Sequence, residues 1–246
     1  MKSQERHKLK QNEFATTVLH AREAIEARRR DIVWAVIVVI ALLASVGAYA
    51  GWRQSRTNRS TELLATALAV HQAPVVPLAA PAPGSPAPVQ QPGTYTTEQA
   101  KLEAALPKFI DAADRYPATD AGIAARYHAA GILASLGRFP EAEQRYQEVV
   151  AKAGSTIYAR TAKLGLADTQ LAQNKFDSAI NIYTELSRDS SSQMPVDGVL
   201  MQLGRACARA GRKEEAVRAF TRVTEEFPQS LYAADARKEL EEARKS

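Results

Sequence analysis

The chain has 246 residues, of which 46% are hydrophobic and 24% charged, a composition typical of globular material that can bury a core. Its formal net charge of +5 is concentrated near the N-terminus, because residues 1–31 hold eight Lys or Arg against five Asp or Glu, and the rest hold 24 against 22. The larger part is therefore nearly neutral. This argues against nucleic-acid binding, which needs a basic surface for phosphate.

Residues 32–52 form a stretch of 21 residues without a charge, IVWAVIVVIALLASVGAYAGW. At about 1.5 Å per residue, a helix of this length spans a hydrocarbon core of about 30 Å. We predict a transmembrane helix here and a cytoplasmic basic tail at residues 1–31. A cleaved signal peptide is the alternative, because Ala48-Tyr49-Ala50 resembles a small-residue cleavage site.

The orientation of this helix follows from the basic residues on its two sides. Eight Lys or Arg precede it and three follow closely, namely Arg53, Arg56 and Arg59. Since positive charge is retained in the cytoplasm, the N-terminus is predicted to be cytoplasmic and the chain to span the membrane once. The lone Cys207 makes no intramolecular disulfide and does not identify the compartment.

The next segment is predicted as a juxtamembrane helix, residues 53–72, followed by a Pro/Ala-rich linker or insertion, residues 73–96, which contains seven prolines. Helical spacing of apolar residues continues at Leu63, Leu64, Ala67, Leu68 and His71. Two interpretations stay open. This helix is either the first helix of an early hairpin, with the prolines inserted inside that hairpin, or a stalk that continues from the membrane.

A period of 37 residues dominates the rest of the sequence. The repeated alanines are Ala105, Ala142, Ala179 and Ala216. An aromatic residue follows each alanine by four positions, at Phe109, Tyr146, Tyr183 and Phe220, and an apolar residue follows by seven, at Ala112, Val149, Leu186 and Val223. These spacings place all three residues on one face of a helix.

Turn and cap residues share the period. Gly137, Asn174 and Gly211 stand five residues before three of the alanines, where a turn needs left-handed backbone. Thr119, Thr156 and Ser230 are expected to cap the helices that follow them, and Thr96 with Gln99 to form a capping box before an earlier helix. We predict helix pairs at residues 120–152, 157–188 and 195–227, and a closing helix at residues 231–244.

These residues resemble the tetratricopeptide repeat family, most closely in the third unit, where Leu203-Gly204, Gly211, Ala216, Phe220 and Pro228 fill the motif. The resemblance covers about residues 97–244. It implies an all-α fold in which a transmembrane helix is followed by a solenoid of helical hairpins, with the repeat domain at residues 97–246. Arg126 and Lys163 depart from the motif, which has a large apolar residue at that position.

The family resemblance also assigns a peptide-binding groove to the first helix of each pair. The groove positions are Tyr127, Gly131, Ser135, Leu164, Asp168, Ala172, Met201, Arg205 and Arg209. Among them Tyr127, Leu164 and Met201 are one period apart and are expected to form an apolar stripe suited to an extended polypeptide. In the alternative interpretation these side chains pack against the neighbouring or the closing helix.

The sequence contains no pattern that predicts catalysis. Its four histidines are scattered, no nucleophile elbow or phosphate-binding glycine pattern occurs, and Cys207 falls at a helix-packing position. We therefore expect no enzyme activity, no cofactor and no metal site. An enzyme or regulatory subunit is the competing class, and a hydrolase assay of the purified domain would separate the two.

The organisation of the chain is similar to the bacterial ancillary Sec-translocon subunit family, in the opening Arg6-His7-Lys8-Leu9-Lys10-Gln11-Asn12-Glu13-Phe14, the single span and the repeat domain. The resemblance implies a bacterial inner-membrane protein with a periplasmic repeat domain that meets translocon subunits, a periplasmic chaperone or exported polypeptides. An envelope scaffold in cell division or outer-membrane assembly is the alternative. Self-association of the repeat domain as a homo-oligomer is a further one.

Overall fold

The computed structural model describes residues 29–78, 89–154, 156–188 and 194–245. Throughout these residues the regular secondary structure is helical, which confirms the all-α prediction. The chain divides into two compact units, residues 1–55 and 56–246. The basic opening at residues 6–14, which carries the resemblance to the translocon subunit, lies outside the described residues.

The described part of the first unit is the beginning of α2 (Arg29–His71). This helix is long and apolar enough to cross a membrane, although a signal sequence near an N-terminus has the same properties. Its apolar side chains have no protein cover: Trp34 is 59% exposed and Leu43 is 66% exposed. The helix continues without a break past Trp52, where the predicted span ends.

The end of α2 belongs to the second unit and packs there against α3 (Glu98–Arg115). Ala67 is fully buried, and the His71 ring lies 5.9 Å from that of Phe109 on α3. The Arg56 guanidinium lies 5.7 Å from the ring centroid of Tyr116, directly after α3. Residues 56–71 are therefore both a continuation of the apolar helix and the packing partner of α3, so the two interpretations of this segment do not exclude each other.

Between α2 and α3, the two ends of the proline-rich segment are joined by backbone hydrogen bonds. The Val76 amide donates to the Tyr95 carbonyl at 2.8 Å, and the Tyr95 amide donates to the Pro74 carbonyl at 3.0 Å. This short bridge lets α2 and α3 pack as neighbours although more than twenty residues separate them in sequence.

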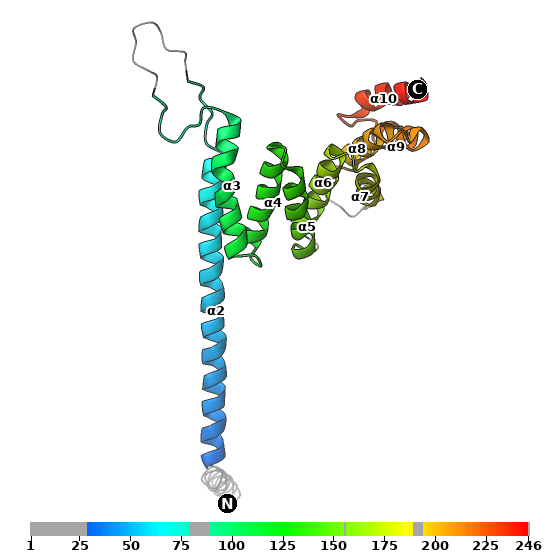
Figure 1. The fold of residues 1–246 in the computed structure, drawn as a ribbon. Helices are drawn as coiled ribbons and strands as arrows, with labels where there is room; N and C mark the ends of the chain where they lie inside the picture. The colour runs from blue at the N-terminus through cyan, green and yellow to red at the C-terminus, as the bar shows by residue number, and fades with distance from the viewer. Residues whose placement is uncertain (1–28, 79–88, 155, 189–193, 246) are drawn as a thin grey trace, which may run out of the picture. The chain divides into compact units, whose positions relative to one another are not determined.

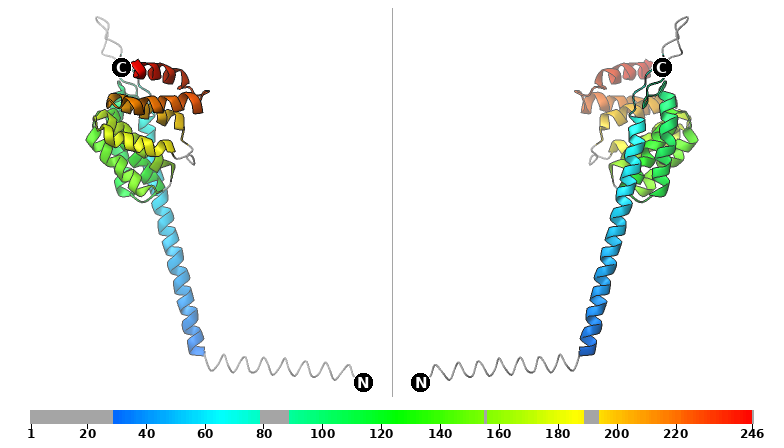
Figure 2. Two further views of the ribbon diagram at one scale, coloured as in Figure 1. Left: turned by 90° about the vertical axis from the view of Figure 1, so that its right-hand side faces the viewer. Right: turned by 90° about the vertical axis from the view of Figure 1, so that its left-hand side faces the viewer.

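The remaining helices follow one another as antiparallel hairpins, each in contact with the next (Figure 1). They are α4 (Asp120–Ser135), α5 (Phe139–Lys152), α6 (Ile157–Ala172), α7 (Phe176–Arg188), α8 (Val196–Arg209), α9 (Lys213–Glu226) and α10 (Ala233–Lys245). These bounds confirm the three predicted helix pairs. Figure 2 shows α10 (red) alongside α9 (orange), the helix on which it packs at the C-terminal end.

The residues of the 37-residue period form the core of the stack. All four repeated alanines are fully buried, and the aromatic residues that follow them are at most 6% exposed. Helices approach closely where glycine faces these rings: a Cβ on Gly204 would lie 2.4 Å from the Phe220 ring, and one on Gly165 would lie 2.5 Å from the Tyr146 ring. The motif glycine therefore permits close contact between α8 and α9.

The turns were predicted correctly and the caps only in part. Gly137, Asn174 and Gly211 have φ of 73°, 59° and 73°, as the left-handed turn requires. The Thr119 hydroxyl accepts from the Gly122 amide at 3.1 Å, which confirms that cap.

Thr156 is the N-cap residue of α6 as predicted, but its side chain makes no cap hydrogen bond. The predicted capping box is wrong. No capping box forms, because Thr97 rather than Thr96 is the N-cap and accepts from the Ala100 amide, and Gln99 donates to Glu103 instead. Adjacent threonines give the same sequence signal, and the backbone angles at Thr97 decide between them.

The candidate helix face and its C-terminal pocket

The first part of the candidate groove is aromatic. Tyr127 on α4 is half-buried, and its ring lies 6.0 Å from that of Tyr146 on α5 and 5.8 Å from that of Tyr158 on α6. Gly131 lies one turn further along α4, where a Cβ would be 3.5 Å from the Tyr146 hydroxyl oxygen. Ser135 is exposed and its hydroxyl donates a hydrogen bond to the Gly131 carbonyl. Tyr158 is not among the predicted groove residues. It lies outside the positions that the family resemblance assigns, and the only sequence signal for it is its place in the first turn of α6, after the predicted cap Thr156.

The second part lies on α6 and combines two apolar residues with one carboxylate. Leu164 is half-buried and Ala172 is exposed. Asp168 lies between them with one side open to solvent, and it accepts a hydrogen bond from the Tyr183 hydroxyl at 2.6 Å. The surrounding protein raises the pKa of the Asp168 carboxyl, and the bond from Tyr183 partly opposes that rise.

The third part lies on α8 and corrects the predicted apolar stripe. Met201 is only 1% exposed and belongs to the buried cluster that contains Ala236 and Leu240 of α10. The stripe predicted from Tyr127, Leu164 and Met201 is therefore interrupted at Met201. Met201 instead follows the alternative interpretation, in which these side chains pack against a neighbouring or closing helix. The helix is α10, which contributes Ala236 and Leu240 to the same cluster.

The two arginines of α8 are engaged within the chain. Arg205 donates from Nε and Nη2 to Glu239 of α10, at 2.8 and 2.6 Å, and this interaction raises the pKa of Arg205. Arg209 is exposed, donates to the Asn174 side chain at 3.0 Å, and lies 5.4 Å from the centre of the Phe176 ring. Both guanidinium groups are thus held in fixed places beside the candidate face.

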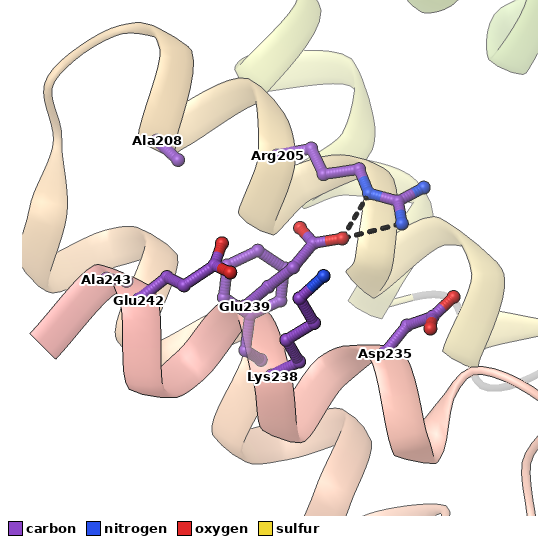
Figure 3. A pocket seen from close by; sticks show the side chains of 8 residues that line it. Arg205, Ala208, Asp235, Lys238, Glu239, Glu242 and Ala243 are labelled. Carbon is purple, nitrogen blue, oxygen red and sulfur yellow. Dashed lines mark hydrogen bonds and ion pairs between the residues drawn. The ribbon is translucent and has the colours of Figure 1, made fainter.

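The candidate face continues onto α10, where a pocket of about 490 Å³ opens against α8. Figure 3 shows Arg205, Glu239, Lys238 and Glu242 around this opening. Lys238 and Glu242 stand one period after Met201 and Arg205, so they occupy groove positions of a fourth unit. They are absent from the predicted groove because α10 was predicted to be a closing helix; extending the 37-residue period by one step predicts them.

The described residues hold no group of three or more His, Cys, Asp or Glu side chains that could bind a metal ion. Cys207 is fully buried, and burial raises the pKa of its thiol to about 11. A thiol with this pKa is a poor nucleophile at neutral pH. The candidate face presents aromatic side chains next to charged groups that have partners within the chain, an arrangement that can bind another molecule.

Comparison with known proteins places this geometry in a family. A profile described as a tetratricopeptide repeat-like domain matches residues 29–193, which is more than half of the chain, and a tetratricopeptide repeat profile matches residues 164–230. The chain belongs to the tetratricopeptide repeat-like domain family. The first profile begins with α2, so the family pattern includes the apolar helix together with the hairpins. Tetratricopeptide repeat domains are protein-interaction modules and are typically non-catalytic scaffolds.

Solved structures with the same fold have low sequence identity to the chain. The TPR-like repeats of a Podosopora anserina kinesin light chain align with a TM-score of 0.53 at 15% identity, over 59% of this chain and 78% of that one. A tetratricopeptide repeat protein from Parabacteroides merdae aligns with a TM-score of 0.50 at 18% identity, over 60% and 56%. No curated protein matches the chain. These similarities establish the fold of the repeat domain.

Proposed function

We propose that the chain is a single-pass membrane protein of the bacterial envelope whose repeat domain binds polypeptides of the Sec export route. The observation that carries the anchoring is the surface of α2. From Val33 to Trp52 its large apolar side chains are between 48% and 66% exposed. Leaving such side chains in water costs about 25 cal/mol per Å², so a lipid bilayer is the environment that this surface fits.

The repeat domain supports binding of a polypeptide rather than of a small molecule. Its candidate face runs along successive hairpins from Tyr127 through Leu164 to Lys238, and it alternates aromatic, apolar and charged groups. Extended segments are recognised in this way, through side-chain pockets spaced along a rigid scaffold. The proposed partners are translocon subunits, a periplasmic chaperone or exported chains, and the basis for them is the resemblance in organisation described above.

The proposed orientation puts the N-terminus in the cytoplasm and residues 53–246 in the periplasm. The basic residues before the apolar stretch outnumber those after it by eight to three. The same orientation follows if residues 1–50 are a signal peptide, but the mature protein would then be soluble, so the two cases differ in mass and in solubility.

Anchoring is tested by expressing the full chain, measuring its intact mass and extracting the membranes with alkaline carbonate. We expect a mass of 26.8 kDa and retention in the membrane fraction. A matched variant with Val39→Arg and Leu43→Arg should be released, because a charged residue near the middle of a span costs about 3 kcal/mol on insertion scales. A mass reduced by residues 1–50 together with release by carbonate would contradict the anchor.

Association with the translocon is tested by purifying the tagged chain in a mild detergent and probing for translocon subunits. We expect these subunits in the eluate of the full chain. If a cell-division or outer-membrane-assembly protein is recovered in fixed proportion instead, the scaffold alternative replaces the translocon in this proposal. The anchor and the protein-binding role would be unaffected by that result.

A further inference from the structure

A buried arginine of the first repeat unit, residues 120–152, connects its two helices with the preceding helix α3. Arg126 of α4 is 3% exposed; its Nε lies 2.8 Å from a Glu148 carboxylate oxygen on α5, and its Nη2 donates to the Ala113 carbonyl at 3.0 Å. Asp114, the next residue of α3, has a carboxylate oxygen 3.5 Å from the same guanidinium. This oxygen accepts a hydrogen bond from Arg145 at 2.7 Å. The first unit thus holds a cation between two carboxylates.

The second repeat unit, residues 157–188, has one ion pair at the corresponding positions. Lys163 stands one period after Arg126, and it forms an ion pair with Glu185, which stands one period after Glu148. In both units a cation from the first helix of a pair is thus matched with a carboxylate from the second, buried at Arg126 and partly exposed at Lys163.

The third unit reverses the charges at the same positions. Two periods after Arg126 stands Leu200, two periods after Glu148 stands Arg222, and two periods after Asp114 stands Arg188. Arg145 is replaced in the same register by Ala219. The central cation has become an apolar residue, and both carboxylates have become arginines.

A cavity of about 250 Å³ opens at this place, lined by residues of α7, α8 and α9. Its apolar lining includes Leu200, Cys207 and Ala219, which are at most 3% exposed. The loss of the long Arg126 and Arg145 side chains in this register explains why the space is open here and filled in the first unit.

The cavity also has a positively charged side. Arg188, Arg218 and Arg222 line it together with a single acid, Glu215, and Arg188 and Arg218 are exposed to solvent. Arg222 binds Glu226 at 2.7 Å, and Glu215 lies 3.7 Å from Arg212. No ion pair within the described part of the chain involves Arg188 or Arg218. An apolar cavity under two such cations fits a ligand in which a carboxylate is attached directly to an apolar group.

We propose that this cavity binds the C-terminal residue of a partner polypeptide, with its aliphatic side chain inside and its terminal carboxylate between Arg188 and Arg218. The cavity of about 250 Å³ is large enough to admit one side chain of the size of leucine. The first repeat unit supports a carboxylate ligand at this place. There the same positions already pair a guanidinium with carboxylates, except that the chain supplies the carboxylates from the positions that hold arginines in the third unit. An internal Asp or Glu is a weaker fit, because its carboxylate lies at the tip of the side chain that would have to fill the apolar cavity.

This site is distinct from the candidate groove. On α8 the cavity residues Leu200, Leu203 and Cys207 and the groove positions Met201, Arg205 and Arg209 lie on opposite sides of the helix, since 3.6 residues make one turn. The proposal therefore goes beyond the proposed function, and partner capture through the groove can fail or succeed without deciding it.

The test uses the full chain in a non-ionic detergent and the fluorescein-labelled peptide Gly-Ser-Gly-Ser-Leu-Leu, followed by fluorescence anisotropy. We expect the peptide with a free C-terminal carboxylate to bind at least about ten-fold more tightly than its C-terminal amide. Arg188→Gln combined with Arg218→Gln should weaken binding about ten-fold without affecting the fold, because both side chains are exposed.

The matched control is Arg237→Gln combined with Arg244→Gln, which removes the same charge from exposed positions of α10. This control should bind like the unmodified chain. Equal affinity for the acid and the amide, or an equal loss in the two double variants, would overturn the proposal. Equal or tighter binding of an amidated peptide with one internal Glu would overturn the assignment to a C-terminus.

Discussion

Arg126 shows at the scale of a single residue how a departure from the repeat motif is accommodated. The motif places a large apolar residue here. The arginine stays buried because its guanidinium forms ion pairs with Glu148 and Asp114 and donates a hydrogen bond to the Ala113 carbonyl. The Arg145 hydrogen bond and the nearby Arg126 lower the pKa of Asp114 despite its partial burial. These interactions connect α3, α4 and α5 across two units.

Replacing Arg126 tests whether its charge or its volume stabilises the stack. Arg126→Ala should lower the free energy of unfolding by about 2–4 kcal/mol, because it leaves a cavity and removes the partner of two carboxylates. Arg126→Met should cost about 1 kcal/mol or less, because it fills the space and the two carboxylates remain accessible to water. Urea denaturation compares them, and an equal loss in both variants would show that the ion pairs dominate.

A pH dependence is expected from His128, whose ring stacks on Phe109 at 5.2 Å and lies 6.3 Å from His71. Burial, and secondarily the charge of His71, lower the pKa of His128 below its ordinary value of 6.5. The unfolded chain therefore takes up the proton first as the pH falls. Stability is full above pH 6.5 and is lost as the pH decreases from there through the folded pKa.

The measurement is the melting temperature between pH 7.5 and 5. We expect it to fall across this range, and we expect His128→Phe to remove most of the fall, because phenylalanine keeps the stacking on Phe109 and cannot be protonated. A variant that keeps the full slope would place the pH dependence in another group.

At the scale of elements, α2 is the least ordinary part of the fold, because one helix supplies both the apolar stretch and a packed face of the first hairpin. Ala67 is fully buried against the core that includes Phe109, and Ala69, half a turn away, is exposed. Ala67→Glu should therefore lower the melting temperature of the full chain by several degrees, because a charge enters the core.

Ala69→Glu is the matched control and should have almost no effect. If both variants melt like the unmodified chain, the end of α2 is not part of the cooperative repeat domain. The melting temperatures of both variants are measured by circular dichroism at 222 nm.

The elements were predictable because each is specified by a strong local signal. An alanine and an aromatic residue recur together every 37 residues and indicate which helix face is buried, and Gly137, Asn174 and Gly211 mark the turns. Signals that depend on one hydrogen bond were weaker. Thr96 and Thr97 are equivalent in sequence, and only the backbone angles select Thr97 as the cap.

At the scale of the whole molecule, the order and pairing of the hairpins followed from the period, but the accessible surface did not. Met201 has the register of a groove residue, yet the helix packed beside it leaves it 1% exposed. The same register continued onto α10 brings Lys238 and Glu242 to the pocket. Exposure depends on what a neighbouring helix covers, which a single repeat of sequence does not specify.

In the proposed function, the repeat domain of a membrane-anchored chain captures export-route polypeptides through the face that carries Tyr127 and Leu164. The most direct test places a photocrosslinking residue at Tyr127, Leu164 or Ala172 of the full chain in living cells, with Arg237 on α10 as an exposed control. We predict crosslinks to translocon subunits, a periplasmic chaperone or exported chains from the three face positions and not from the control. Silence at all three, or the same products as from Arg237, would contradict the account.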